Sequence, residues 1–111
     1  KMMRNMQHAA TMVGTYYWMA PEILRQDGMG YTFAADIWSL GMVMVELTTL
    51  KNPYHENGMA WATTKQMILS AMPPQIGDKC PMRIKQLIRS CLRRDPSERP
   101  NTRQVLYALQ E

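Results

Sequence analysis

The chain has 111 residues, of which 46% are hydrophobic and 20% charged, a balance typical of a core-forming globular sequence and not of a disordered one. Its 13 Lys and Arg against nine Asp and Glu give a formal net charge of +4, which does not by itself indicate a nucleic-acid binder. No stretch approaches the roughly 18 apolar residues of a membrane span, so we expect no membrane partner.

The cysteine and histidine pattern predicts no metal site. Cys80 and Cys91 fit neither a disulfide scaffold nor a four-ligand zinc site, so we expect reduced thiols in a cytoplasmic protein. His8 and His55 are isolated and lack metal-ligand spacing. The 12 methionines are explained by flexible apolar packing, with a soft-metal site of thioethers as the alternative.

The sequence opens on Lys1 without a cleavable signal pattern, so we expect a segment of a longer protein.

The first half of the chain predicts two helices. Residues 1–18 show no sustained period and predict an irregular segment. Pro21 is well placed to begin a short helix through about residue 25. The clearest helix runs from Thr32, a plausible N-cap, to about Thr49, and it is apolar on every side.

Three further helices are predicted in the second half. One runs from about 59 to 72 and would be stopped by Pro73-Pro74. The next, 81–92, has apolar residues at i, i+3, i+4, i+7 and i+8 and basic residues outside that face. Asn101 and Gln104 form a capping box for the last helix, through about residue 109.

No strand, repeat or low-complexity tract is evident, so the predicted fold class is mainly α. A helix that is apolar all round needs neighbours on every side, yet only four short helices accompany the one at 32–49. We therefore expect an apolar surface that other polypeptide covers.

Four blocks of sequence point to a family. Residues 11–22, ending in Ala-Pro-Glu, resemble the end of the activation segment of eukaryotic protein kinases. Residues 36–41 resemble the start of the family's buried central helix, 52–54 the loop after it, and 91–100 the approach to its last helix. The blocks occur in the family's order over nearly the whole chain. The sequence therefore resembles a Ser/Thr protein kinase, similar to the MAP kinase kinase kinase and p21-activated kinase groups.

This resemblance implies a domain organisation. The whole chain, 1–111, would be a partial kinase domain from the helical C-terminal lobe of a fold that is α+β when complete, with the N-terminal lobe absent. Within it, 1–22 would form the activation segment and substrate wall, 32–49 the buried central helix, and 59–111 the C-terminal helices.

The resemblance also implies roles for the residues before the Ala-Pro-Glu block. Thr15 would hydrogen-bond the catalytic aspartate and lysine, which favours Ser/Thr specificity; the alternative is a turn threonine without such partners. Gly14, Thr15, Tyr16, Tyr17 and Trp18 would form the wall that binds substrate. Tyr16 departs from the family, because proline is usual at that position.

Two further functional positions follow. Thr11 lies four residues before Thr15, where related kinases carry an activating phosphothreonine; the alternative is a solvated loop residue. Glu46 faces a site that reads a basic substrate residue in some relatives.

Supporting roles follow for five more residues. Glu22 and Arg99 would form a buried ion pair between the activation segment and the turn before the last helix. Asp36 would hold the catalytic loop through backbone hydrogen bonds, besides its favourable place at a helix N-terminus. Val43 and Leu47 would support the apolar column beneath the adenine ring.

The family implies ATP and Mg²⁺ in the complete domain, but this sequence lacks the Gly-rich loop, the nucleotide lysine, the catalytic loop and the metal-binding motif. We therefore expect the chain alone to bind neither ATP nor Mg²⁺ and to be inactive. The implied function is part of a kinase that transfers the ATP γ-phosphate to protein Ser/Thr. Its implied partners are protein substrates, an upstream kinase or regulatory domain, and the missing lobe. The alternative is a truncated, inactive remnant that acts as a protein-binding module.

Eight of the 13 basic residues fall between Lys79 and Arg103. A solvated helix face explains them, with a docking surface for an acidic partner as the alternative. A basic helical nucleic-acid binder is the third interpretation, but nothing beside the cluster resembles a nucleic-acid motif, so we expect no nucleic-acid partner.

Overall fold

The computed structural model describes residues 18–25, 32–55, 60–70 and 72–110. These residues are helical and contain no strand, which confirms the predicted mainly α class. The elements, in chain order, are α3 (Pro21–Leu24), α4 (Phe33–Thr49), α5 (Trp61–Leu69), α6 (Met82–Cys91), the 3₁₀ helix η2 (Pro96–Glu98) and α7 (Thr102–Gln110). Of the predicted irregular segment 1–18, residues 1–17 lie outside the described residues.

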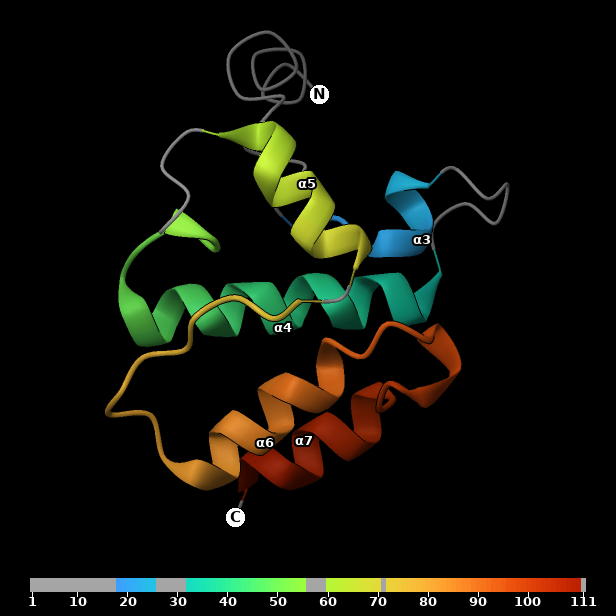
Figure 1. The fold of residues 1–111 in the computed structure, drawn as a ribbon. Coiled ribbons are helices and arrows are strands. Elements are labelled where there is room, and N and C mark those ends of the chain that lie inside the picture. Colours follow the sequence, from blue (N-terminus) through green and yellow to red (C-terminus); the bar gives the residue numbers. More distant parts are fainter. Residues whose placement is uncertain (1–17, 26–31, 56–59, 71, 111) are drawn as a thin grey trace, which may run out of the picture.

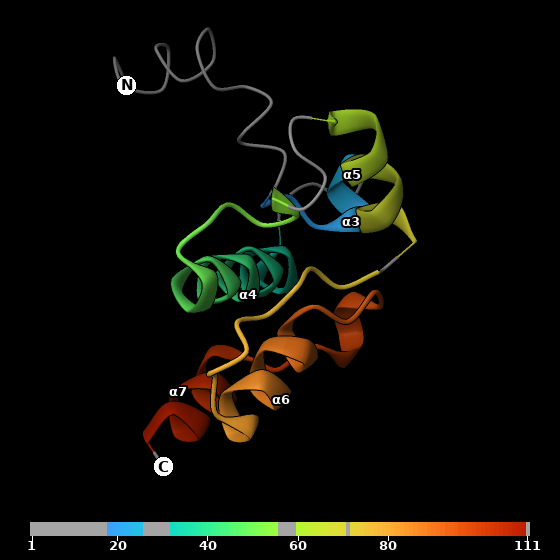
Figure 2. The same ribbon diagram turned by 60° about the vertical axis from the view of Figure 1, so that its left-hand side comes forward.

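Helix α4 lies in the middle of the molecule. In Figures 1 and 2, α3 and α5 cover one side of it, and α6 and α7 lie on the opposite side. The main core gathers around α4 residues Trp38, Met42 and Val45, each no more than 1% exposed. A second cluster joins α4, α6 and α7 through Ile37, Cys91 and Val105, among others.

The ends of α4 follow from its sequence. The Thr32 Oγ1 accepts a hydrogen bond from the Ala35 N–H at 3.1 Å, so Thr32 is the predicted N-cap. At the other end Leu50 takes the left-handed conformation, with φ at 60°, and its N–H bonds to the Glu46 carbonyl. Between them, Gly41 permits close packing against α6, because a Cβ there would lie 2.8 Å from Leu92 Cδ2.

Helix α4 nevertheless keeps an exposed apolar stripe. Its exposed fractions are 86% for Phe33, 39% for Leu40, 41% for Val43 and 68% for Leu47. The apolar surface predicted from the sequence is therefore present among the described residues. We call these four residues the α4 stripe.

The later helices agree with the sequence, with one difference. Helix α5 ends at Leu69 with Ser70 as C-cap, and so is shorter than the predicted 59–72. The capping box of α7 is confirmed: Gln104 N–H donates to Asn101 Oδ1 at 2.8 Å, and Asn101 N–H donates to Gln104 Oε1 at 2.9 Å.

The connection between α5 and α6 runs along α4 (Figure 1). Two hydrogen bonds fix it. The Tyr54 hydroxyl donates to the Met72 carbonyl at 2.7 Å, and the Gly77 N–H donates to Thr48 Oγ1 at 3.0 Å. Gly77 is required there, because a Cβ would lie 2.4 Å from the Thr48 carbonyl oxygen.

Candidate functional site

Glu22 and Arg99, 77 residues apart, form a buried bidentate ion pair. Arg99 Nη1 lies 2.8 Å from Glu22 Oε2, and Nη2 lies 2.8 Å from Oε1. The Arg99 side chain is 0% exposed, and the Glu22 side chain is 5% exposed. The pair predicted from the sequence is thus present, and it joins α3 to the turn before α7. A planar guanidinium matches a carboxylate in this way, which fixes orientation as well as distance.

The other Arg99 donors are also occupied. A guanidinium has five N–H groups, and two of them bond to Glu22. The remaining three bond to backbone carbonyls at 2.9, 2.7 and 3.2 Å, those of Ala34, Arg93 and Arg94, respectively. One side chain therefore connects α3, the first turn of α4 and the segment after α6. We call this arrangement the Arg99 site.

Trp38 completes the Arg99 site. Its ring lies beneath the guanidinium, 5.1 Å from Arg99 Cζ to the ring centroid, which is a cation–π arrangement. Trp38 is 1% exposed, and its Nε1 is the buried side-chain nitrogen without a hydrogen-bond partner among the described residues. The indole therefore contributes its face and its packing here.

A second contact holds the chain just before α3. The Ser39 hydroxyl donates to the Trp18 carbonyl at 2.5 Å, so α4 holds the segment at Trp18, while Arg99 holds it at Glu22. The sequence placed Ser39 in a family block without predicting this bond, because a contact over 21 residues leaves no local pattern. Residues 18–22 are therefore held at both ends against the start of α4.

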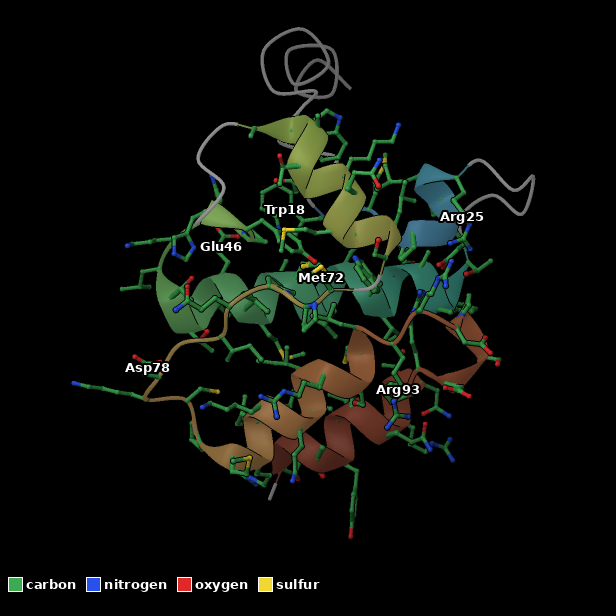
Figure 3. All side chains as sticks on the ribbon, viewed as in Figure 1. Trp18, Arg25, Glu46, Met72, Asp78 and Arg93 are labelled. Atoms are coloured by element: carbon green, nitrogen blue, oxygen red, sulfur yellow. The ribbon has the colours of Figure 1, made fainter. Side chains whose placement is uncertain are left out.

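The other predicted site residues lie on different parts of α4. Asp36 is exposed in the first turn, and Glu46 is half-buried near the end. In Figure 3, Trp18 and Glu46 both lie on the side of α4 where α5 packs. Val43 and Leu47 belong to the exposed α4 stripe. Thr11 and Gly14 to Tyr17 fall outside the described residues.

Among the residues that the structure describes, two titratable groups have shifted pKa values. Burial raises the pKa of the Cys91 thiol to about 11, with smaller opposing effects from Ser90 and Arg99. Hydrogen bonds from the Ser97 hydroxyl and N–H lower the pKa of Asp95, the N-cap of η2. Neither group belongs to the predicted site.

The described part of the chain does not fit a metal centre. It contains no group of three or more His, Cys, Asp and Glu side chains that could hold an ion. The family's Mg²⁺ would therefore need ligands from outside the described residues. Nor is any described helix both long enough and apolar enough to span a bilayer.

Comparison with known proteins identifies the class. The family model "Protein kinase domain" matches residues 1–108. The chain therefore belongs to the protein kinase domain family, and its helices correspond to part of the C-terminal lobe of that fold.

The relatives include a germinal center kinase and two mitogen-activated protein kinase kinase kinases. "Germinal center kinase 3" of Caenorhabditis elegans is 38% identical over 107 residues, which cover 86% of this chain and 17% of the relative. "Mitogen-activated protein kinase kinase kinase A" of Dictyostelium discoideum is 38% identical over 96 residues, 86% of this chain and 10% of that protein. "Mitogen-activated protein kinase kinase kinase 3" of Arabidopsis thaliana is 41% identical over 93 residues, which cover 84% of this chain and 15% of that protein. The chain thus spans less than a fifth of these relatives.

Proposed function

We propose that this chain is part of a Ser/Thr protein kinase that transfers the γ-phosphate of ATP to Ser or Thr of protein substrates. Segment 1–22 supplies the substrate wall and the activation switch, 32–49 the central helix, and 59–111 the C-terminal helices. The family match and the relatives support the activity. The observation that carries the role of this segment is the Arg99 site, which fixes the chain at Glu22.

The Arg99 site supports the proposed substrate wall by its position. A peptide-binding wall must hold its shape, because a displacement of about 1 Å at a reacting group costs about 100-fold in rate. Trp18 and Glu22 are both bonded to fixed groups, so the end of the wall has a defined place. Thr15, three residues before Trp18, would then reach the catalytic aspartate and lysine. Glu46, on the same side of α4 as Trp18, would meet a basic substrate residue.

The same bonds at Trp18 and Glu22 support an activation switch at Thr11. A phosphothreonine there would add about −1.5 to −2 charge and three acceptor oxygens, which order a loop beside arginines. Because the segment is fixed at Trp18, ordering residue 11 would set the path of the residues between them. An upstream kinase is the implied partner.

The test is phosphate transfer by the intact protein. With ATP, Mg²⁺ and peptides that offer Ser, Thr or Tyr, we expect transfer to Ser and Thr. Thr15→Ala should lower kcat/KM about 100-fold through lost positioning. Thr15→Ser, which keeps the hydroxyl, is the matched control and should retain most activity.

Thermal melting of both variants separates catalysis from folding, since neither should shift the midpoint. An intact protein that transfers no phosphate would contradict the proposal and leave the inactive binding module in its place. Equal loss in both Thr15 variants would contradict the role of the hydroxyl.

A further inference from the structure

The surface of α6 carries charge of one sign. From Lys79 to Arg94 the sequence holds six basic residues and no acidic one. Five of the six are exposed, and the sixth, Lys85, is half-buried. They are Lys79, Arg83, Lys85, Arg89, Arg93 and Arg94. Such a run sets up a positive potential over the helix that attracts anionic groups.

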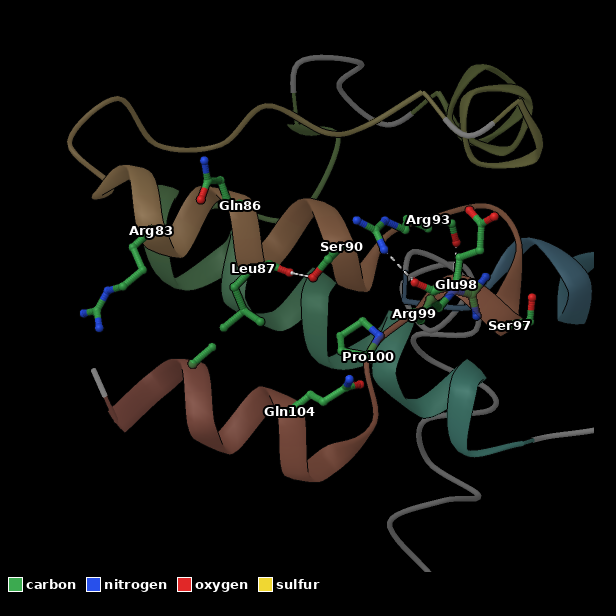
Figure 4. A pocket seen from close by; sticks show the side chains of 11 residues that line it. Arg83, Gln86, Leu87, Ser90, Arg93, Ser97, Glu98, Arg99, Pro100 and Gln104 are labelled. Carbon is green, nitrogen blue, oxygen red and sulfur yellow. Dashed lines mark hydrogen bonds between the residues drawn. The ribbon is translucent and has the colours of Figure 1, made fainter.

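A groove of about 540 Å³ lies between this helix and α7 (Figure 4). Leu87 and Pro100 supply apolar surface within it. Polar side chains line it from both helices: Gln86, Ser90 and Gln104. Ser90 donates its hydroxyl proton to the Leu87 carbonyl at 2.6 Å, which leaves the oxygen free to accept a second hydrogen bond. A groove with amide and hydroxyl side chains over an apolar floor suits a peptide backbone.

Arg83 lies at one end of the groove, and Arg93 lies toward the other end, beside Glu98 (Figure 4). They are ten residues apart, mostly along α6, which corresponds to about 15 Å at the helical rise. An extended peptide advances about 3.3 Å per residue, so four to five residues span that length. Two carboxylates at this spacing would each face one arginine.

The charges within the groove leave a net positive balance. Arg99 also lines it, but its charge is matched by Glu22. Arg93 Nη1 donates a hydrogen bond to the Glu98 carbonyl oxygen at 2.8 Å, and the guanidinium has further N–H groups that can donate to a ligand. Glu98 is the one acidic side chain among the lining residues, and it opposes an anion at the Arg93 end.

We propose that the groove between α6 and α7 binds an extended acidic segment of a partner protein, with carboxylates four to five residues apart. The apolar floor and the hydrogen-bonding side chains favour a peptide over a uniformly charged polymer. This interaction is distinct from phosphate transfer. A protein inactive as a kinase could still bind the peptide, so the two proposals fail separately.

The test is fluorescence anisotropy with the intact protein and a labelled octapeptide that carries glutamates at positions 2 and 6. Arg83→Glu should weaken binding about five- to tenfold, because it replaces attraction at an exposed site by repulsion. Arg89→Glu makes the same charge change on the same helix, but Arg89 does not line the groove. It lies about 120° round the helix from Arg83 and should change binding less than about twofold. Glu98→Gln should tighten binding about twofold.

Two controls make the result decisive. A peptide with glutamines in place of both glutamates should bind at least about fivefold more weakly. Equal loss of peptide affinity from Arg83→Glu and Arg89→Glu would overturn the proposal that the groove is the binding site, because it would show only a general charge effect. Tighter binding of a DNA duplex or of phosphatidylserine vesicles than of the peptide would overturn the choice of partner.

Discussion

At the scale of single residues, Arg99 makes contacts with its whole guanidinium group. All five of its N–H groups have acceptors, and its face lies on Trp38. A buried ion pair is weak evidence of stability by itself, because desolvation offsets the attraction between the charges. The contribution of this pair is geometric: it holds three segments that are distant in sequence.

Removing one partner of the pair should be costly. Glu22→Gln leaves the Arg99 charge buried and unmatched, and we expect a loss of about 3–5 kcal/mol in the free energy of unfolding. Glu22→Gln combined with Arg99→Met removes both charges, but it also leaves the Ala34, Arg93 and Arg94 carbonyls without their donor, so it should recover little of the loss. Glu98→Gln, the same change at an exposed carboxylate, is the matched control and should stay within about 0.5 kcal/mol. Urea denaturation of the intact protein measures all three, and equal effects of Glu22→Gln and Glu98→Gln would contradict the role of burial.

At the scale of elements, α6 shows how one helix serves two environments. Its inner face packs Leu87, Ile88 and Cys91 at 7%, 0% and 0% exposure. Its outer face carries Arg83 and Arg89, which are exposed. The close approach of α4 at Gly41 depends on this inner face, since a Cβ at Gly41 would lie 2.9 Å from Cys91 Cβ. Cys91 is therefore a probe of the contact between the two helices.

The two cysteines should differ in reactivity. The thiolate is the reactive form, and burial raises the pKa of Cys91 to about 11 from 9.0, so this thiol stays protonated at pH 8. Because the folded pKa is raised, this group's contribution to stability is complete below about pH 9 and is lost as the pH rises through 11. With iodoacetamide at pH 8, peptide mass spectrometry should find the label on half-buried Cys80 and not on Cys91. In urea both should react. Labelling of Cys91 in the native protein would show that α6 does not stay packed on α4.

Local patterns predicted the elements well, and distant contacts less so. Thr32, Asn101 and Gln104 act over three residues, so their caps could be identified in the sequence. The bond from Ser39 to the Trp18 carbonyl joins residues 21 apart and depends on how two segments meet. The Glu22–Arg99 pair was predicted because both residues stand in family blocks, whereas periodicity alone would have left them as surface charges.

The end of α5 was predicted less well. Pro73-Pro74 forbids a helix beyond it but does not require the helix to reach it. The Tyr54 hydroxyl bonds to the Met72 carbonyl, so the chain before Pro73 is already committed to a tertiary contact. That contact involves the loop after α4, and no window of sequence around α5 contains it.

At the scale of the whole molecule, the layers around α4 are incomplete. In Figure 2, α3 and α5 cover one side of α4, and α6 and α7 cover the other. The α4 stripe stays exposed. Exposed apolar side chains gathered on one helix in this way are typical of a contact with other polypeptide. The matched segments cover only 17%, 10% and 15% of the three relatives, so each relative contains further polypeptide beyond its matched segment.

The α4 stripe leads to opposite expectations for the isolated chain and the intact protein. Leu47 is 68% exposed here, so Leu47→Gln in the isolated chain should lower the binding of an apolar dye without lowering stability. In the intact protein we propose that Leu47 is covered, and Leu47→Gln should then cost about 2–5 kcal/mol by burying an amide where a leucine packed. Leu106→Gln on α7, at a residue 54% exposed, is the matched control and should stay within about 0.5 kcal/mol in both.

Dye fluorescence and urea denaturation measure the two effects. If Leu47→Gln costs nothing in the intact protein, the α4 stripe is free there, which would contradict the partial kinase lobe and favour a binding module that uses α4 itself.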